Sequence, residues 1–469
     1  MISFALLGHP ANYDHLDHLL HQLRPDLAPK KTGTSADGVA QLFELVPSYA
    51  EKATLHIAPN VNGKLIVCTF LPDRLTTPKQ LTTAHHKTRD ACQLAKELGA
   101  HIAGLGGFTS ITMAGKLNAL SAELDIALTT GGSLTSALAL AQIDSLLEKL
   151  KLKIESQTVA ILGASGEIGS ACMNALAPRA QKVIAIARNK NKLDSVVSNL
   201  RNTFASTDSN DAYHADLIIA ATSSAQPLLR EDDLKRGAIL CDIGYPKTIV
   251  EGKSRRPDVL VFGGGLAESP LTFDLHLDTG LPSPRLMYGC FSETITLALA
   301  RRFENFSDGE SPITVERLEE ILALACAGGF KPSPLYRGRE MITEENLEAY
   351  CVMRETNIIV HSSLFILHSS FVILHCSFFI LHCSLFMTPT ESELQQIVAA
   401  KLKVKPEQVP LDKSFIEDIG LDSFDLMSII IEIEEVFPHI SLAADEAQAL
   451  KTLKEVAAYI DHQKRLPSS

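Results

Sequence analysis

Between residues 158 and 262, short apolar segments alternate with stretches that have helical periodicity. The apolar segments are rich in Val, Ile and Leu and cover residues 158–162, 182–187, 215–221, 238–243 and 258–262. Parallel strands need a crossover between them, and the intervening stretches are long enough to supply one. This pattern predicts an α/β fold with a Rossmann-like, doubly wound parallel sheet.

The first of these segments ends in a turn with three glycines, Gly163, Gly166 and Gly169. Their GxxGxxG spacing differs from the GxGxxG fingerprint of dinucleotide sites, so the spacing alone is weak evidence. The position between a strand and a helix strengthens it, because backbone N–H groups and the helix N-terminus can hold a pyrophosphate there. We therefore predict that a dinucleotide binds at Gly163, Ala164, Ser165, Gly166, Glu167, Ile168 and Gly169.

The end of the second apolar segment indicates which dinucleotide is used. An NAD site usually places Asp or Glu at this position for the ribose hydroxyls, whereas this chain has Arg188, with Lys190 and Lys192 close behind it. A guanidinium suits the 2′-phosphate of NADPH, so we expect NADPH and assign Arg188 to it. The alternative is a solvated basic turn at a helix start. The strand ends at 221–224 and 242–247 are expected to flank the nicotinamide, where Tyr245 and Lys247 are candidate proton donors or structural residues.

The length of 469 residues exceeds what one hydrophobic core supports. We expect an α/β domain at 1–150, a nucleotide-binding domain at 151–338, a linker at 339–386 and a separate domain at 387–469. Two glycine-bearing turns, at 104–110 and 129–133, either approach a ligand or are ordinary tight turns. The net charge of −12 argues against nucleic-acid binding, and nine cysteines without a CxxC pair suggest a reducing cytoplasm.

Cys290 lies where a Pro-containing stretch enters a predicted helix. A helix N-terminus favours the thiolate, and a thiolate suits thioester exchange. The acyl-enzyme that forms can accept a hydride and release an aldehyde. From the residues alone, a buried structural cysteine is the more common interpretation of such a position.

Residues 1 to about 338 resemble the cyanobacterial-type long-chain acyl-(acyl carrier protein) reductases. The resemblance rests on seven short motifs: Phe4-Ala-Leu-Leu-Gly-His9, Leu105-Gly-Gly-Phe-Thr-Ser110, Thr129-Thr-Gly131, the 163–169 turn with Arg188, Gly244-Tyr-Pro-Lys247, Gly263-Gly-Gly265 and Cys290-Phe-Ser-Glu293. It implies that Cys290 is the acylated nucleophile, that NADPH is the reductant, and that residues 1–150 handle the acyl chain and its carrier. Gly132, Ser133 and Gly289 depart from the cyanobacterial pattern. These differences bear on which acyl chain length the protein prefers.

A seven-residue apolar repeat beginning at His361, His368, His375 and His382 separates this part from the rest of the chain. The stretch 358–389 has no charged side chain, so it could span a membrane by length and hydropathy. A single span would separate the two halves of the protein, so we favour a buried hairpin, weak membrane-surface contact through 361–386 or an aggregation-prone linker. The regular His and Cys spacing follows from the repeat itself, and we predict no metal site. Two neighbouring reading frames joined through repetitive DNA would explain the arrangement.

Residues 387–469 are acidic, with 15 Asp and Glu against 8 Lys and Arg. Helical stretches at 391–402, 424–437 and 453–460 predict an all-α, four-helix bundle. The Gly420-Leu-Asp-Ser423 motif resembles the acyl carrier protein family, which implies 4′-phosphopantetheine on Ser423. A helix N-terminus would favour the added phosphate there, although Ser423 could also be an N-cap. Phe424 follows this serine, at a position where the acyl carrier protein family more commonly has Leu.

Together these features predict NADPH-dependent reduction of an acyl thioester to a fatty aldehyde. The expected partners are an acyl carrier protein, in cis or in trans, and a phosphopantetheinyl transferase. Two alternatives remain open: a dehydrogenase like shikimate or glutamyl-tRNA reductases, and a non-catalytic carrier scaffold.

Overall fold

The computed structural model describes residues 2–354, with gaps at 24–35, 52, 225, 253–254 and 274–279. In the C-terminal segment it describes residues 389–411, with gaps at 403 and 407–408, the single residues 433, 436 and 437, and residues 452–463. The chain divides into two compact units, Met1–Ser363 and Leu364–Ser469. Among the described residues, no helix is both long and apolar enough to cross a membrane.

The first unit contains two large sheets. In the first sheet the strand order is β2-β4-β1-β5-β6, with β3 paired to β4. Strands β4, β1, β5 and β6 run parallel, and β2 and β3 are antiparallel to β4. The strands are β1 (Phe4–Gly8), β2 (Tyr49–Ala50), β3 (Leu55–Ala58), β4 (Val61–Val67), β5 (Ile102–Leu105) and β6 (Ala127–Thr129).

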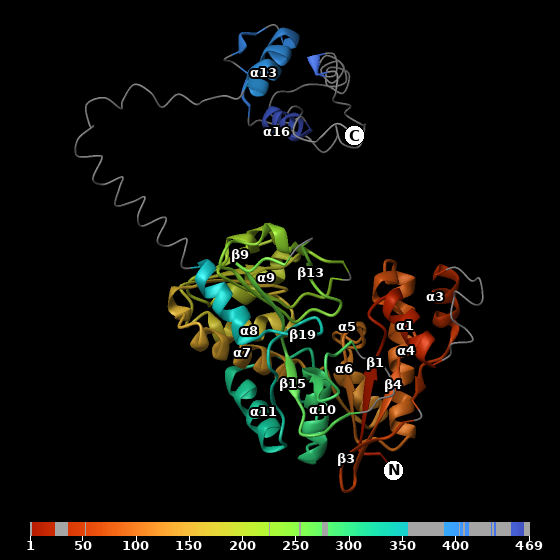
Figure 1. Cartoon of the computed structure of the whole chain (residues 1–469). Coiled ribbons are helices and arrows are strands. Elements are labelled where there is room, and N and C mark those ends of the chain that lie inside the picture. Colours follow the sequence, from red (N-terminus) through yellow and green to blue (C-terminus); the bar gives the residue numbers. More distant parts are fainter. Residues whose placement is uncertain are drawn as a thin grey trace. The chain divides into compact units, whose positions relative to one another are not determined.

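Strand β1 shows how this sheet acquires two buried faces. Ala5 and Leu7 pack into a core with α4 (Pro78–Glu97), whereas Phe4 and Leu6 pack into a core with α10 (Gly289–Leu299). Alternate residues of a strand point to opposite faces, so an uninterrupted apolar run is what such a strand requires. Figure 1 shows β1 and β4 beside α4 and α6 (Leu117–Leu124).

The second sheet has the order β14-β12-β10-β7-β8-β9, and all five pairings are parallel. The order reverses at β7, which confirms the predicted doubly wound sheet and puts its switch point between β7 and β10. The strands are β7 (Thr158–Leu162), β8 (Lys182–Ile186), β9 (Thr203–Ser206), β10 (Leu217–Ala220), β12 (Ile239–Asp242) and β14 (Leu260–Gly263). Five of them match expected segments, and β9 was not expected.

Helices cover one face of the second sheet and irregular segments cover the other. Val159 and Ile161 pack with α7 (Gly132–Lys149) and α8 (Glu167–Leu176), and Ala160 and Leu162 face the core around Ala212. Helix α7 also contributes Leu134 and Leu138 to the core of the first sheet. One helix therefore joins the two sheets, and α10 and α11 (Val315–Ala327) pack against it.

Smaller elements complete the first unit. The helices are α1 (Tyr13–Leu23), α3 (Ala36–Leu45), α5 (Phe108–Thr112) and α9 (Lys190–Val197), with short 3-10 turns at Pro72–Arg74, Ile154–Ser156, Ser209–His214 and Glu231–Asp233. The strands are β11 (Leu229–Arg230), β13 (Ile249–Val250), β15 (Leu266–Glu268), β16 (Leu286–Tyr288), β17 (Lys331–Pro332), β18 (Tyr336–Arg337) and β19 (Glu340–Met341). Residues 344–354 are helical, and Leu347 and Tyr350 are buried in the core of the second sheet. The folded part thus extends past residue 338, where we expected a linker to begin.

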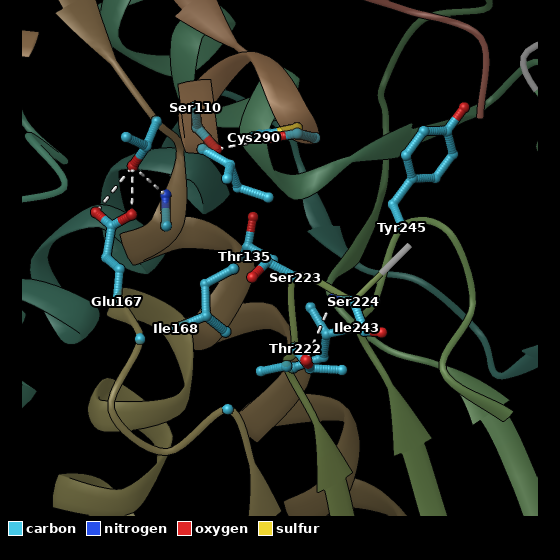
Figure 2. Close-up of a pocket in the computed structure, with 18 of the residues that line it drawn as sticks. Ser110, Thr135, Glu167, Ile168, Thr222, Ser223, Ser224, Ile243, Tyr245 and Cys290 are labelled. Atoms are coloured by element: carbon cyan, nitrogen blue, oxygen red, sulfur yellow. Dashed lines mark hydrogen bonds between the residues drawn. The ribbon is translucent and has the colours of Figure 1, made fainter. Parts of the chain in front are cut away.

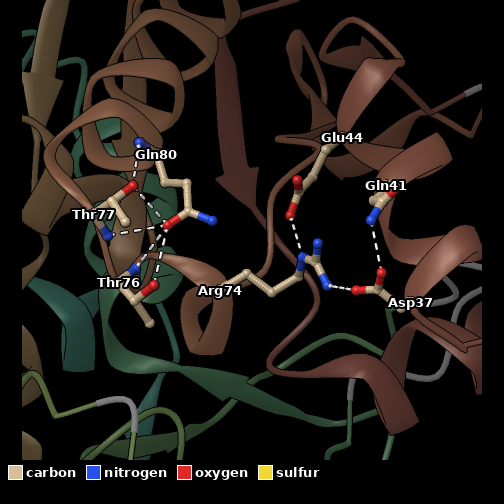
Figure 3. A network of polar contacts seen from close by, with 7 residues as sticks. All are labelled: Asp37, Gln41, Glu44, Arg74, Thr76, Thr77 and Gln80. Carbon is tan, nitrogen blue, oxygen red and sulfur yellow. Dashed lines mark hydrogen bonds and ion pairs between the residues drawn. The ribbon is translucent and has the colours of Figure 1, made fainter.

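A polar network fixes α3 and the start of α4 (Figure 3). Arg74 donates to Glu44 at 2.8 Å and to Asp37 at 2.5 Å, which ties both ends of α3 to the 3-10 turn that follows β4. Thr77 caps α4 by accepting from the N–H of Gln80, whose side chain accepts from the N–H of Thr77. This reciprocal capping box satisfies two backbone donors that a helix start leaves open.

In the second unit the structure describes α13 (Pro389–Leu402) and α16 (Leu453–Gln463). Leu394, Val398, Val456 and Ile460 share an apolar core. These helices agree with two of the helical stretches expected in 387–469. Most of the stretch 424–437, the phosphopantetheine candidate Ser423 and the repeat at 361–386 lie outside the described residues.

Candidate active site

A cavity of about 660 Å³ opens where the carboxyl ends of strands from both sheets come together. The turn after β7, the ends of β8, β10 and β12, the ends of β1 and β5, and the start of α10 all contribute to its lining. In open α/β folds, ligands bind outside the carboxyl ends of the strands at the switch point. Figure 2 shows Cys290, Glu167 and Tyr245 around this cavity, together with Thr222, Ser223 and Ser224.

The glycines of the 163–169 turn meet close steric demands. Gly163 has φ +81°, and a Cβ there would lie 2.3 Å from the carbonyl oxygen of Ala221. At Gly169 a Cβ would lie 2.2 Å from the carbonyl oxygen of Gly163, so α8 can pack this tightly only with glycine. Gly166 lines the cavity, and a Cβ there would come no nearer than 3.2 Å to its closest neighbour, the carbonyl oxygen of Gly163. Close packing therefore requires glycine at Gly163 and Gly169, whereas a Cβ at Gly166 would need only a small adjustment of its neighbour.

Five of the seven residues predicted for this turn line the cavity, and two are buried behind it. The lining residues are Gly163, Ser165, Gly166, Glu167 and Ile168. Ala164 has no exposed surface, and Gly169 is buried in α8. These two residues therefore support the turn from behind.

Arg188 also lines the cavity, at the end of β8, beside Asn189 and Lys192. Asn189 caps α9 by accepting from the N–H of Lys192 at 3.0 Å. Arg188 forms no ion pair with any residue that the structure describes. Arg188 therefore stays the predicted contact for the 2′-phosphate of NADPH.

Cys290 is the second residue of α10 and faces the same cavity as the 163–169 turn. The expected helix start is therefore present, but the expected low thiol pKa is wrong. Burial, together with the charge of nearby Glu293, raises the pKa of Cys290 to about 12. Backbone N–H groups of Phe291 and Gly107 act in the opposite direction but do not outweigh desolvation. The thiol is protonated in this state.

The two glycine-bearing turns of the first 150 residues enclose Cys290. A Cβ at Gly131, which has φ +72°, would lie 2.1 Å from the Cα of Cys290. The backbone N–H of Gly107, which has φ +60°, acts on the sulfur and lowers the pKa of the thiol. Both turns bring backbone close to the cysteine, and ordinary tight turns would not need such an approach.

His9 holds the turn at 104–110 in place. Its Nε2 accepts from the N–H of Phe108 at 2.8 Å, and its Nδ1 contacts the carbonyl oxygen of Pro10 at 2.8 Å, so the ring is the neutral Nδ1–H tautomer. Burial lowers the pKa of His9 to about 4, which agrees with a neutral ring. Because both nitrogens are engaged, His9 is not a free base for Cys290.

The candidate proton donors have structural contacts. Lys247 donates to the carbonyl oxygen of Asp242 at 2.8 Å. The Tyr245 hydroxyl lies 3.3 Å from Nδ1 of His15, and burial raises the pKa of Tyr245 well above its usual value. Tyr245 lines the cavity, whereas Lys247 does not.

Two carboxyl groups, those of partly buried Glu167 and fully buried Glu293, hold the turn that contacts Cys290. Thr130 donates to both oxygens of Glu167 at 2.8 Å. Glu293 accepts from Thr129 at 2.5 Å and from the N–H of Leu134 at 2.8 Å. Burial raises the pKa of Glu167 to about 7 and also raises the pKa of Glu293.

Sequence reasoning did not assign these supporting roles to His9, Thr130 and Glu293. All three lie in motifs that carried the family resemblance, at residues 4–9, 129–131 and 290–293, and that was the available signal. No group of three or more His, Cys, Asp or Glu residues suited to a metal ion occurs in the part of the chain that the structure describes.

Comparison with known proteins identifies both parts of the chain. The phosphopantetheine attachment site family matches residues 392–460, and the shikimate/quinate 5-dehydrogenase family matches residues 145–263. The nucleotide-binding domain of glutamyl-tRNA reductase from Thermoplasma volcanium is 23% identical, with a TM-score of 0.20, and the match covers 26% of this chain and 83% of that chain.

Two curated relatives each match one part. An acyl carrier protein of Chlamydia trachomatis is 40% identical over 74 residues, which cover 16% of this chain and 95% of that protein. The long-chain acyl-(acyl-carrier-protein) reductase of Synechococcus elongatus is 30% identical over 287 residues, which cover 59% of this chain and 84% of that protein. The chain therefore belongs to the long-chain acyl-(acyl-carrier-protein) reductase family and carries a C-terminal domain of the acyl carrier protein type.

Proposed function

We propose that this protein reduces a fatty acyl thioester to a fatty aldehyde with NADPH, through an acyl-enzyme at Cys290. The observation that carries the proposal is that Cys290 and the 163–169 turn line one cavity. A nucleophile and a dinucleotide site that share a cavity can act in sequence on one acyl group.

The proposed reaction has two balanced steps. In the first, the Cys290 sulfur attacks the thioester carbonyl, the phosphopantetheine sulfur leaves, and the thiol proton passes to that leaving sulfur. In the second, NADPH, when bound, supplies a hydride to the acyl carbon, and the bond to Cys290 breaks. The Cys290 sulfur then takes up a proton, and the products are an aldehyde and a free thiol.

The raised pKa of Cys290 affects the first step. A protonated thiol is a weak nucleophile, so the proton must leave as the carbon–sulfur bond forms. The backbone N–H groups of Gly107 and Phe291 lower the pKa of the thiol and would stabilise developing thiolate charge. We infer that the thiol is activated by the incoming substrate and reacts only slowly before it arrives.

The proposed acyl donor is a phosphopantetheine thioester on an acyl carrier protein, in cis or in trans. For the donor in cis, a phosphopantetheinyl transferase would first modify Ser423 in the matched carrier domain. A tethered carrier raises the local donor concentration to the order of mM if the linker spans the distance. The reaction uses reagents of the cytoplasm, where we propose that the protein acts.

The direct test is to incubate the full chain with NADPH and a C16 acyl carrier protein, and to measure NADPH oxidation together with aldehyde. We expect equal amounts of both, and neither with Cys290→Ala. NADPH oxidation with shikimate-like substrates would favour the dehydrogenase alternative. No NADPH oxidation with any thioester would favour the carrier scaffold. Ser423→Ala separates the two donors, because it abolishes turnover only of a thioester carried in cis.

A further inference from the structure

Glu167 is a partly buried acid to which the proposed reaction gives no chemical step, and it lies at a connection between the two sheets. It is the first residue of α8, in the turn assigned to the dinucleotide. Its carboxyl group is directed away from the strand ends of the second sheet and towards residues 130–132, at the start of α7 (Figure 2). A Cβ at Gly132 would lie 2.6 Å from the Glu167 carboxyl carbon, so the acid fits closely against this turn.

The contacts of Glu167 lead directly to the cysteine. Thr130, which is 8% exposed, donates to both carboxyl oxygens at 2.8 Å, and its own N–H is bonded to the carbonyl oxygen of Ser307 at 2.8 Å. The next residue, Gly131, packs closely against the Cys290 backbone. A Cβ at Gly131 would lie 2.1 Å from the Cα of Cys290, so no side chain fits there. One hydrogen bond and one peptide unit therefore separate the dinucleotide turn from the cysteine.

The charges around Glu167 explain why this hydrogen bond matters. Burial raises the pKa of Glu167 most, and the charges of Glu293 from α10 and Asp308 from the loop that follows it also raise it. Thr130 and the N–H of Gly309 act in the opposite direction. Glu167 makes no ion pair within the described residues, so Thr130 is its main partner, and an acid in this setting is placed by its hydrogen bonds.

We propose that Glu167 is a positioning residue, which holds the Thr130–Gly131 turn and thereby sets Cys290 at a fixed place relative to the bound dinucleotide. The inference rests on the proposed function of Cys290. A shift of about 1 Å in a reacting group can lower a rate by about 100-fold. Loss of the Glu167–Thr130 contact should therefore slow hydride transfer to the acyl group while leaving the earlier acyl transfer to Cys290 largely intact.

The experiment separates these two steps in the full-length chain. Acylation of Cys290 by a C16 acyl carrier protein is followed without cofactor by intact mass, and NADPH is then added to measure the single-turnover hydride step. The variants are Glu167→Ala, Thr130→Val, their combination and Glu167→Gln, which retains an acceptor for Thr130. Thr88→Val is the matched control, because Thr88 is a buried threonine of α4 whose hydroxyl bonds to Ala84 and Thr112, away from the cavity.

We expect Glu167→Ala and Thr130→Val each to slow the hydride step about tenfold, because a displacement of Cys290 by less than about 1 Å should cost less than about 100-fold. The rate of acylation should change less than about twofold. The double variant should be no slower than the slower single variant, because both remove one contact. Glu167→Gln should stay within about threefold of the parent, and Thr88→Val should match the parent. Equal losses in both steps, multiplied losses in the double variant, or a Gln variant as slow as the Ala variant would overturn the proposal.

A second measurement does not depend on turnover. Saturating NADP⁺ should protect Cys290 of the parent from iodoacetamide, and protection should weaken in Glu167→Ala and Thr130→Val at their own saturating concentrations. Unchanged protection in both variants contradicts the positioning role. If the parent is never acylated yet the variants lose protection, the proposed function fails and the coupling between Glu167 and Cys290 stands.

Discussion

Gly131 and Cys290 meet backbone to backbone: a Cβ on Gly131 would lie 2.1 Å from the Cα of Cys290 and 2.7 Å from its carbonyl oxygen. The first residue belongs to the turn before α7 and the second to the start of α10. Their contact joins the loop that Glu167 holds to the proposed nucleophile. The reactive part of the cavity therefore depends on a residue with no side chain.

Gly131→Ala should displace Cys290 and abolish its acylation. The new methyl group cannot be accommodated without moving one backbone, and φ +72° adds about 1 kcal/mol of strain for a residue other than glycine. Gly115→Ala is the control, because Gly115 has φ +70° but a Cβ there meets nothing within 4 Å. Acylation followed by intact mass should fall at least about 100-fold in the first variant and stay near parental in the second. Full acylation of Gly131→Ala would show that the contact is unimportant.

Arg188→Ala should weaken NADPH binding and leave NADH binding unchanged. Arg188 lines the cavity at the end of β8 and has no ion-pair partner in the described part of the chain. Loss of a charge-assisted contact to the 2′-phosphate should raise the Kd for NADPH about 10–100-fold, which corresponds to about 1.5–3 kcal/mol. Fluorescence titration with both cofactors measures the ratio. An equal loss for NADPH and NADH would mean that Arg188 does not read the 2′-phosphate.

Alkylation of Cys290 should rise with pH throughout the neutral and mildly alkaline range. Since burial raises the pKa of this thiol to about 12, the folded state favours the protonated form, and the thiolate fraction grows about tenfold per pH unit up to that value. Iodoacetamide rates on the ligand-free chain at pH 7, 8 and 9, read by peptide mass, should therefore increase without levelling. A plateau at or below pH 8 would indicate the low-pKa thiolate that the helix start alone suggests.

The buried ion pair between Arg337 and Glu231 should stabilise the first unit. Arg337 donates to both carboxyl oxygens at 2.8 and 2.7 Å, and the two side chains are 11% and 1% exposed. Arg337→Met leaves Glu231 buried and without its cation, so we expect a loss of about 3–5 kcal/mol. Lys149→Met is the control, because the Lys149–Glu344 pair is 53% and 74% exposed and should contribute less than about 1 kcal/mol. Thermal melting that shows equal shifts would contradict this difference.

Local sequence patterns predicted the second sheet well, because its strands are continuous apolar runs with both faces covered. Strand β9 was missed, since it is an edge strand and Phe204 is 57% exposed, which leaves no buried run to recognise. The 163–169 turn was predicted because its chemistry is local: strand, glycines and helix follow one another in the chain.

The surroundings of Cys290 could not be predicted in the same way. Its pKa is raised mainly by desolvation, and the residues around it include Gly107 and Gly131, which lie far from it in the sequence. A helix N-terminus is visible in the sequence, whereas desolvation depends on tertiary packing and here has the larger effect. The same holds for His9, whose partner is the backbone of Phe108.

The account depends most on Cys290 accepting the acyl group from a carrier thioester. The full-length protein is incubated with a C16 acyl carrier protein and no NADPH, and its intact mass and peptides are measured. We predict one added acyl group of that chain length, located on Cys290, which disappears with release of aldehyde when NADPH is added. A chain that turns over NADPH and forms aldehyde without ever carrying an acyl group on Cys290 would contradict the account.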